Sequence, residues 1–370
     1  MMKKMALTCF VLFLSLISGA CHGGLNEEEV VLKTNTRVIT DMAGRRVEIP
    51  QKIEKVYSTG QPGVVALYTI NPDLLLGWCL KLSQEEGRYI EAKYLGLPVL
   101  GLMQGSNDTA NREEIMRRTP DLILMMTYLD ENTISNAEAL QKLMGTPVVL
   151  ADYALTQIPE TYRFLGDVLS ERERTELLAR YCEDVLAKAR ETVALIPEDH
   201  RRAVYYAQGS KGLQTVPRGS SHSEVIDLVG GKNIVTLPAD SDGRLTVNME
   251  QILSWNPEVV IASYSMGHSG VKGDGSIFDI LSNGQESWNL VRAVQNKMVF
   301  ATPCYPYNWL DMPPGVNRII GILWMENLLY PDYFPLDIRE ETRAFYRLFY
   351  HKTLTDEQID TLLIGAVRTN

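Results

Sequence analysis

Residues 113–124 read EEIMRRTPDLIL, and residues 250–261 read EQILSWNPEVVI. In both segments a Glu is followed by Ile two residues later and by Pro seven residues later, and then by an acidic residue and an apolar run. The spacing before the Pro predicts a helix, the Pro ends it, and the apolar run predicts a buried strand. Two copies of one helix–turn–strand unit predict two lobes of related topology.

Short apolar segments accompany each copy of this unit. Residues 55–59 (KVYST) and 203–207 (AVYYA) are expected to be the strands that open the two lobes, and residues 97–102 and 146–151 to be further strands of the first lobe. Helical stretches alternate with these strands, which is typical of α/β sheets with ligand-facing loops at the strand ends. The expected fold is therefore α/β, with two Rossmann-like lobes and a ligand cleft between them.

The region between the two lobes has no strand signals. Across residues 171–196, apolar residues such as Leu178, Val185 and Ala189 recur at helical spacing, and Pro197 ends the pattern. We expect one long α-helix that joins the lobes as a stiff strut and limits their closure. The expected boundaries are a first lobe at 37–156, a linker helix region at 157–198 and a second lobe at 199–370.

The first twenty residues differ in composition from the rest of the chain. Lys3 and Lys4 precede an apolar run, and small residues precede Cys21. This order is typical of a secretory signal peptide. Residues 1–20 resemble a bacterial lipoprotein signal, although Ser18 stands where Leu is usual. The resemblance implies lipidation of Cys21, a flexible tether at 21–36, and a protein anchored in the periplasm or on the outer face of the cell membrane. An ordinary cleaved signal, with Cys21 incidental, is the alternative.

The composition excludes several classes of function. The formal net charge of -10 disfavours nucleic-acid binding, and 370 residues with 45% hydrophobic content favour two domains. Cys79, Cys182 and Cys304 are far apart and are expected to be small buried apolar residues, not zinc ligands. The sequence contains no G-x-S-x-G elbow, P-loop, dinucleotide fingerprint or H-E-x-x-H helix, so we expect no enzyme.

Three features together resemble one family. They are residues 39–56 (ITDMAGRRVEIPQKIEKV), the pair of Glu-to-Pro units, and residues 219–235 (GSSHSEVIDLVGGKNIV). In order and spacing they resemble the substrate-binding proteins of iron-siderophore, haem and cobalamin ABC importers, over essentially the whole mature chain. The resemblance implies a monomeric binding protein that delivers a small-molecule ligand to a permease dimer with its ATPase subunits.

The same resemblance implies a role for Glu113 and Glu250. In those importers, one exposed Glu on each lobe docks into arginine pockets of the permease. Such a charged pair suits reversible docking, because it sets orientation and on-rate. A simpler interpretation is that both are first-turn acids favoured by the helix dipole, and Glu114 beside Glu113 leaves the first assignment uncertain by one residue.

Ligand contacts are expected from loops that follow strands in both lobes. An aromatic-rich cleft with a few cations suits a planar or amphipathic metal chelate. His222 could ligate iron or cobalt, or could form a structural hydrogen bond at the start of a helix. The candidate ligand-binding residues are Ser58, Thr59, Gln61, Trp78, Tyr128, Arg218, His222, Arg244, Tyr264, Tyr307 and Trp309.

The ligand class stays open at this point. A ferric siderophore or related metal chelate is the first hypothesis, and cobalamin or haem is the second. A molybdate- or tungstate-type oxyanion held by Arg218, Arg244 and serine donors is the third, because oxyanion sites need dense hydrogen-bond donors. A ligand sensor and a lipid-anchored hydrolase are alternatives of other classes. No cofactor is expected.

Overall fold

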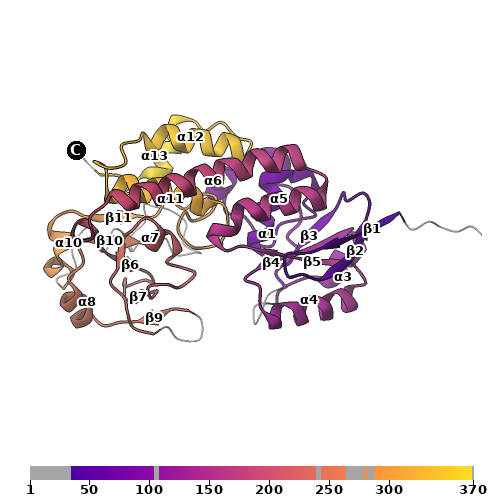
Figure 1. Ribbon diagram of the computed structural model, residues 1–370, viewed down its shortest axis with the longest axis horizontal. Helices are drawn as coiled ribbons and strands as arrows, with labels where there is room; N and C mark the ends of the chain where they lie inside the picture. Colours follow the sequence, from indigo (N-terminus) through magenta and orange to yellow (C-terminus); the bar gives the residue numbers. More distant parts are fainter. Residues whose placement is uncertain are drawn as a thin grey trace, which may run out of the picture. The chain divides into compact units, whose positions relative to one another are not determined.

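Two separate parallel sheets organise the chain, one in each lobe (Figure 1). The computed structural model describes residues 35–103, 108–238, 243–263, 278, 281 and 287–368. Both sheets have helices between consecutive strands, so the predicted α/β class is confirmed.

The first lobe contains a three-stranded sheet. Its strands pair in parallel in the order β3 (Val56–Ser58), β4 (Leu122–Thr127) and β5 (Val148–Asp152). An antiparallel hairpin of β1 (Thr36–Thr40) and β2 (Arg46–Pro50) precedes it. The helices of this lobe are α1 (Gln61–Ile70), α2 (Gln84–Gly87), α3 (Arg112–Arg117), α4 (Glu131–Met144) and α5 (Ile158–Leu169).

The second lobe contains a four-stranded parallel sheet. Its order is β11 (Val299–Ala301), β10 (Val259–Ala262), β6 (Ala203–Ala207) and β8 (Lys232–Asn233). A short antiparallel pair, β7 (Gln214–Thr215) and β9 (Leu245–Thr246), lies beside it. The helices of this part of the chain are α7 (Glu224–Leu228), α8 (Met249–Trp255), α10 (Arg292–Gln295), α11 (Asn317–Leu329), α12 (Ile338–Phe349) and α13 (Asp356–Leu363).

Each lobe contains one copy of the helix–turn–strand repeat that predicted two lobes. The first copy forms α3 and β4, and the second forms α8 and β10. In each copy the residue before the proline has a positive φ, 49° at Thr119 and 45° at Asn256. A left-handed residue at the helix C-terminus followed by proline stops the helix and turns the chain into the strand.

The predicted long helix is α6 (Arg172–Leu195), which runs past both sheets (Figure 1). One hydrophobic core contains the buried face of α6 and one face of each sheet. On β4 this face is Leu122, Leu124 and Met126, and on β6 it is Val204 and Tyr206. The opposite faces of the sheets have their own smaller cores. The two lobes therefore share a core along α6, and residues Thr36–Asn370 form one unit.

The last helices pack against the first lobe, a contact that the sequence did not suggest. The Gln358 side chain donates a hydrogen bond to the Arg88 carbonyl at 2.7 Å, and the Tyr89 hydroxyl donates one to the Gln358 carbonyl at 2.8 Å. Tyr350 lies 5.9 Å from Tyr68 between ring centroids. The C-terminal segment thus spans from the second lobe back to residues 68–94.

One predicted strand is wrong, and the other predicted strands are present in the structure. Residues 97–102 form only an isolated bridge between Trp78 and Val99, because Pro98 has no N–H to donate and Gly101 has a φ of 85°. The strands predicted at 55–59, 146–151 and 203–207 correspond to β3, β5 and β6. The three cysteines expected to be buried are free thiols with little or no exposure, Cys79, Cys182 and Cys304.

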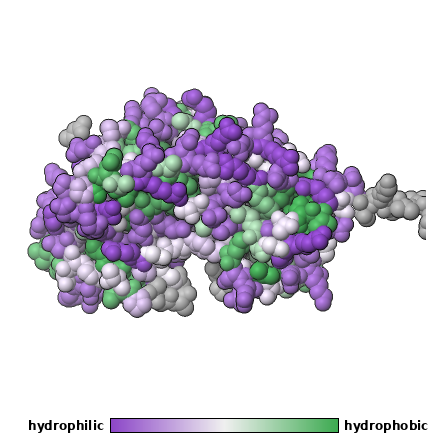
Figure 2. Space-filling model, viewed as in Figure 1, coloured by the Kyte–Doolittle hydropathy of each residue, from purple (hydrophilic) through white to green (hydrophobic). Residues whose placement is uncertain are grey.

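Hydrophilic side chains cover most of the face seen in Figure 2, with small apolar patches between them. Exposed Leu143 and Leu195 belong to different helices. Within the described ranges, no helix has the length and apolar content that crossing a membrane requires.

Glu326 on α11 is a buried acid with an unusual environment. It is 0% exposed, and neither carboxyl oxygen has a hydrogen-bond partner among the described residues. Burial raises its pKa to about 7, and the charge of Lys188 only partly offsets this. The native state therefore holds a proton there more tightly than the unfolded chain, whose Glu has a pKa of about 4.3.

We expect Glu326→Gln to change the pH dependence of stability. The stabilisation linked to Glu326 is complete below about pH 4 and is lost as the pH rises through about 7, because the native state must then bury a charge. Urea unfolding should show the variant to be similar to the unmodified protein near pH 4.5 but more stable at pH 8, by on the order of 1–3 kcal/mol. An equal difference at both pH values would show that Glu326 does not titrate in this range.

Candidate functional site between the lobes

The carboxyl ends of the strands bring polar residues together at one edge of each sheet. In parallel α/β sheets this edge is the usual place for a ligand. In the first lobe, Thr59, Tyr128 and Tyr153 follow β3, β4 and β5. In the second lobe, Gln208, Ser263 and the segment from 302 to 316 follow β6, β10 and β11.

Four neighbouring residues, Arg318, Glu224, Tyr153 and Tyr128, form a ring between these two edges. The Arg318 guanidinium, 0% exposed, forms an ion pair with Glu224 of α7 and donates a hydrogen bond to the main-chain carbonyl of Tyr153 in the first lobe. Tyr153 packs edge-on against Tyr128, with centroids 4.5 Å apart. The Glu224 carboxylate lies close enough to the Tyr128 hydroxyl to raise the pKa of that phenol. The edges of the two sheets therefore face each other across this ring.

The ring also changes the acidity of its tyrosines. Burial first, and then the charge of Glu224, raise the pKa of Tyr128, whereas Arg318 lowers it. Burial likewise raises the pKa of Tyr153. Both phenols are therefore neutral hydrogen-bonding groups at physiological pH.

A second polar cluster surrounds Asp311 in the second lobe. Its two carboxylate oxygens accept hydrogen bonds from the Tyr206 hydroxyl and the Gln208 amide, each at 3.0 Å. Nδ1 of His222 lies 3.7 Å from the same carboxylate, and Nε of Arg244 donates to Oε1 of Gln208 at 3.2 Å. Burial raises the pKa of Asp311, and His222, Tyr206 and Arg244 oppose that shift.

Three of the predicted ligand residues belong to the ring or to the Asp311 cluster. Tyr128 is partly exposed and belongs to the ring, and His222 and Arg244 are partly exposed beside Asp311. Gln61 is partly exposed at the first residue of α1. Arg218 is exposed and donates through its guanidinium to the main-chain carbonyl of Asn233.

Other predicted residues are part of the protein interior. Trp78 donates its indole N–H to the Tyr94 carbonyl, and Trp309 is 0% exposed and packs against Trp324. Tyr307 belongs to the same shared core. Since these rings are covered by protein, they are not available to a ligand in this conformation. The aromatic loop at 305–309 fills the interior because Trp309 packs on Trp324 of α11 and Tyr305 stacks on Tyr89 of the first lobe.

Two predicted polar residues are also enclosed. Ser58 donates a hydrogen bond to the Gly60 carbonyl at 2.7 Å, which holds the turn into α1. Thr59 is 0% exposed, and its hydroxyl has no hydrogen-bond partner among the described residues. Tyr264 and Cys21 lie outside the described residues.

Sequence reasoning missed several residues of the site. Most of the side-chain contacts there involve five residues that the sequence analysis did not select as ligand residues: Asp311, Gln208, Glu224, Tyr153 and Arg318. Tyr153 and Gln208 directly follow strands β5 and β6. Their positions at strand ends are a sequence signal from which they could have been predicted. Asp311 and Arg318 gave no local signal, because their role depends on the path of the segment after β11.

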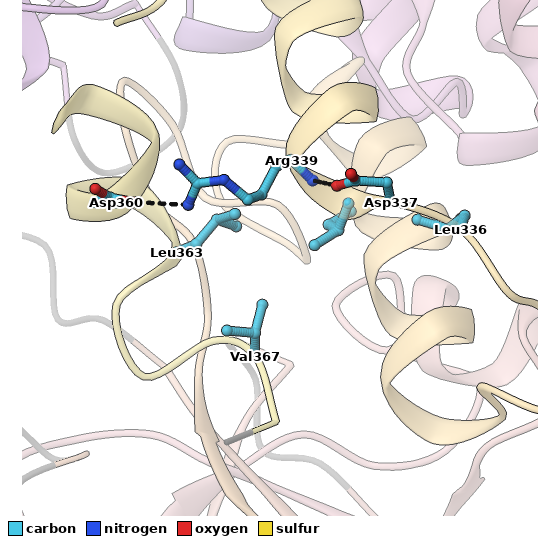
Figure 3. A pocket seen from close by; sticks show the side chains of 7 residues that line it. Leu336, Asp337, Arg339, Asp360, Leu363 and Val367 are labelled. Carbon is cyan, nitrogen blue, oxygen red and sulfur yellow. Dashed lines mark hydrogen bonds and ion pairs between the residues drawn. The ribbon is translucent and has the colours of Figure 1, made fainter. Parts of the chain in front are cut away.

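The described residues do not form a metal site of their own, since no three or more His, Cys, Asp or Glu side chains converge among them. His222 could thus contribute at most a single ligand to a metal held by an organic chelator. A groove of about 620 Å³ lies elsewhere, between α12 and α13 (Figure 3). Its Arg339 is paired with Asp360, and the groove shares no residue with the two polar clusters.

The two glutamates expected to dock occupy equivalent positions. Glu113 is the second residue of α3 and Glu250 the second residue of α8, and both are exposed. Each follows an Asn cap, Asn111 or Asn248, whose side chain accepts a backbone N–H of the first turn. Neither glutamate has a side-chain partner among the described residues. Glu114 instead forms ion pairs with neighbouring arginines, Arg117 and Arg118.

Comparison with known proteins places this arrangement among binding proteins. Residues 105–306 match the sequence profile of a family described as periplasmic binding protein. An ABC transporter solute-binding protein from Sulfurospirillum deleyianum DSM 6946 is 30% identical, with a TM-score of 0.78 over 89% of this chain and 99% of that chain. No curated protein sequence matches this chain.

Two further solved structures share the fold. A periplasmic solute-binding protein from Veillonella parvula DSM 2008 is 24% identical, with a TM-score of 0.72 over 90% of this chain and 98% of that chain. The molybdate-binding protein MolA of a Haemophilus influenzae ABC transporter, bound to molybdate, is 18% identical, with a TM-score of 0.67 over 86% of this chain and 99% of that chain.

We expect Glu224→Ala to destabilise the protein more than a surface change does. The substitution leaves the buried Arg318 charge without its carboxylate partner. Breaking a fully buried ion pair lowers the free energy of unfolding by several kcal/mol, and we expect a loss of about 1–3 kcal/mol here because Glu224 is partly exposed. Urea unfolding at pH 7 measures this, with Glu113→Ala as the control that should lie within about 0.5 kcal/mol of the unmodified protein. Equal effects of the two substitutions would show that the ion pair does not stabilise the fold.

Proposed function

Because this chain belongs to the periplasmic binding protein family and is a periplasmic solute-binding protein of an ABC transporter, we propose that it captures an anionic, oxygen-rich ligand between its lobes. A ferric siderophore or related metal chelate is the first candidate. Proteins of this class bind a small molecule and interact with the permease and ATPase of an importer, and the class is not enzymatic.

One observation carries the ligand proposal. The second lobe presents partly exposed Arg244 and His222 beside the hydrogen-bonding cluster of Asp311. Tyr128 of the first lobe lies close to Glu224, two residues after His222. A guanidinium and an imidazole recognise carboxylate, phenolate or hydroxamate oxygens of a chelate, and a tyrosine ring can cover part of its organic face. The sequence motifs that resemble iron-chelate importers support the same choice. Cobalamin and haem, which need more aromatic cover, are less well matched.

A molybdate-type oxyanion is the second candidate, and a specific observation favours it. With Trp78, Tyr307 and Trp309 in the interior, the partly exposed residues of the two clusters are richer in hydrogen-bond donors than in aromatic rings. Oxyanion sites depend on such donors. The molybdate complex of the similarly folded MolA makes this ligand a reasonable probe.

We also propose that Glu113 and Glu250 dock to the permease. Both are exposed at matching helix starts, whereas Glu114 is held by arginines, whose hydrogen bonds lower its pKa. The structure thus gives a reason to prefer Glu113 over its neighbour. Attachment to the membrane through a lipid on Cys21 stays a prediction.

Ligand binding can be tested directly. We expect the purified protein to retain a ferric catecholate or hydroxamate chelate, or molybdate, in native mass spectrometry and in a ligand-dependent quenching of tryptophan fluorescence. Cobalamin and haem serve as matched probes. Retention of cobalamin or haem alone would contradict the proposed ligand class, and retention of no probe would contradict the capture function for all of these classes.

Docking has a separate test. The double variant Glu113→Ala with Glu250→Ala should abolish uptake in cells while leaving ligand affinity within about twofold, because neither glutamate is bonded to a residue of the two clusters. Glu138→Ala with Glu173→Ala, two exposed helical acids, is the control and should transport normally. Normal uptake by the first variant would exclude the assignment.

A further inference from the structure

Asp311 is a carboxylate that the fold encloses almost completely. It is 3% exposed and lies in the segment between β11 and α11, at the ligand edge of the second sheet. Oδ1 accepts from the Tyr206 hydroxyl and Oδ2 accepts from Nε2 of Gln208. A buried charge is retained at a cost unless its contacts are complete, so this carboxylate needs an explanation.

The hydrogen bonds continue outward from Asp311 with a fixed direction. A carboxylate only accepts, so the Gln208 amide must present its NH₂ group to Asp311. Its carbonyl oxygen then faces the opposite way and accepts from Nε of Arg244 at 3.2 Å. If the amide were reversed, its NH₂ would meet the Arg244 N–H, two donors facing each other. The carboxylate thereby selects one orientation of the amide, and the amide selects one position of the guanidinium.

We propose that Asp311 is a positioning residue of the ligand site, which acts through the Gln208 amide to fix the guanidinium of Arg244. This inference rests on the proposed function, in which Arg244 recognises the ligand. Asp311 itself is enclosed and contacts no ligand. His222, whose Nδ1 lies 3.7 Å from the same carboxylate, is a second side chain of the cluster that is cationic when protonated.

We call the chain of hydrogen bonds from Asp311 through Gln208 to Arg244 the relay. Three substitutions separate the effect of this relay from a general effect of the buried charge. Asp311→Ala removes the acceptor and lets the Gln208 amide turn. Asp311→Asn removes the charge but keeps an oxygen that can accept from Gln208, while its NH₂ group can donate to the Tyr206 hydroxyl, which then donates to Ser263. Gln208→Leu interrupts the relay and leaves Asp311 in place.

Two measurements report on these variants. The Nε–H signal of Arg244 in nuclear magnetic resonance should be protected from hydrogen exchange in the unmodified protein and in Asp311→Asn, and lose that protection in Asp311→Ala and Gln208→Leu. Affinity for molybdate and for a ferric catecholate chelate should fall about tenfold in Asp311→Ala and about tenfold in Gln208→Leu. The double variant should also lose about tenfold, not a hundredfold, because both substitutions interrupt the same chain of hydrogen bonds. Asp311→Asn should stay within about threefold.

Glu326→Gln is the control, since it also replaces a buried acid by an amide but lies in neither cluster, and it should change neither readout. Full protection of the Arg244 signal in Asp311→Ala, additive losses in the double variant, or an Asp311→Asn protein that behaves like Asp311→Ala would each overturn the proposal. If the unmodified protein retains neither probe, the proposed ligand fails, while the Arg244 signal still decides whether the relay exists.

Discussion

The hydrophobic core shared by the two sheets is the constraint on which the rest of the structure depends. One face of each sheet packs on the same cluster, together with α6 and α11. Burial of this surface stabilises the fold by about 25 cal/mol per Å² of apolar area, and a single lobe without the other elements of the core would leave part of that surface exposed to water. The two sheets are therefore joined through one apolar core along α6.

Polar contacts then use the space that this core defines. Arg318 is fully buried because it has a carboxylate and a main-chain carbonyl from different lobes as partners, and without them its charge would be expelled. The cluster around Asp311 follows the same rule within one lobe. Both clusters lie where strands end, so the same topology that completes the core also concentrates hydrogen-bonding groups at the carboxyl edges of the sheets.

Sequence reasoning succeeded where the information was local. The Glu-to-Pro repeat predicted α3–β4 and α8–β10, and apolar spacing predicted α6 to within one residue at each end. It failed for the aromatic segment 305–309, because whether a ring faces a cleft or a core depends on α11 and α12, which pack on it from later in the chain. The candidate site was predicted only in part for the same reason: Tyr128 follows a predicted strand and His222 precedes a predicted helix, but Asp311 and Arg318 are brought there by a segment with no periodic pattern.

The return of the C-terminal helices to the first lobe has a consequence for how the chain reaches its native state. Hydrogen bonds join Tyr89 and Arg88 to Gln358, some 270 positions later. Contacts of such separation are slow to form, since the loop between them must be closed before they contribute. The first lobe is thus synthesised first, but its core is completed only when the last two helices have been made. Apolar surface of the nascent chain is therefore exposed, and can be bound by chaperones, for nearly the entire synthesis.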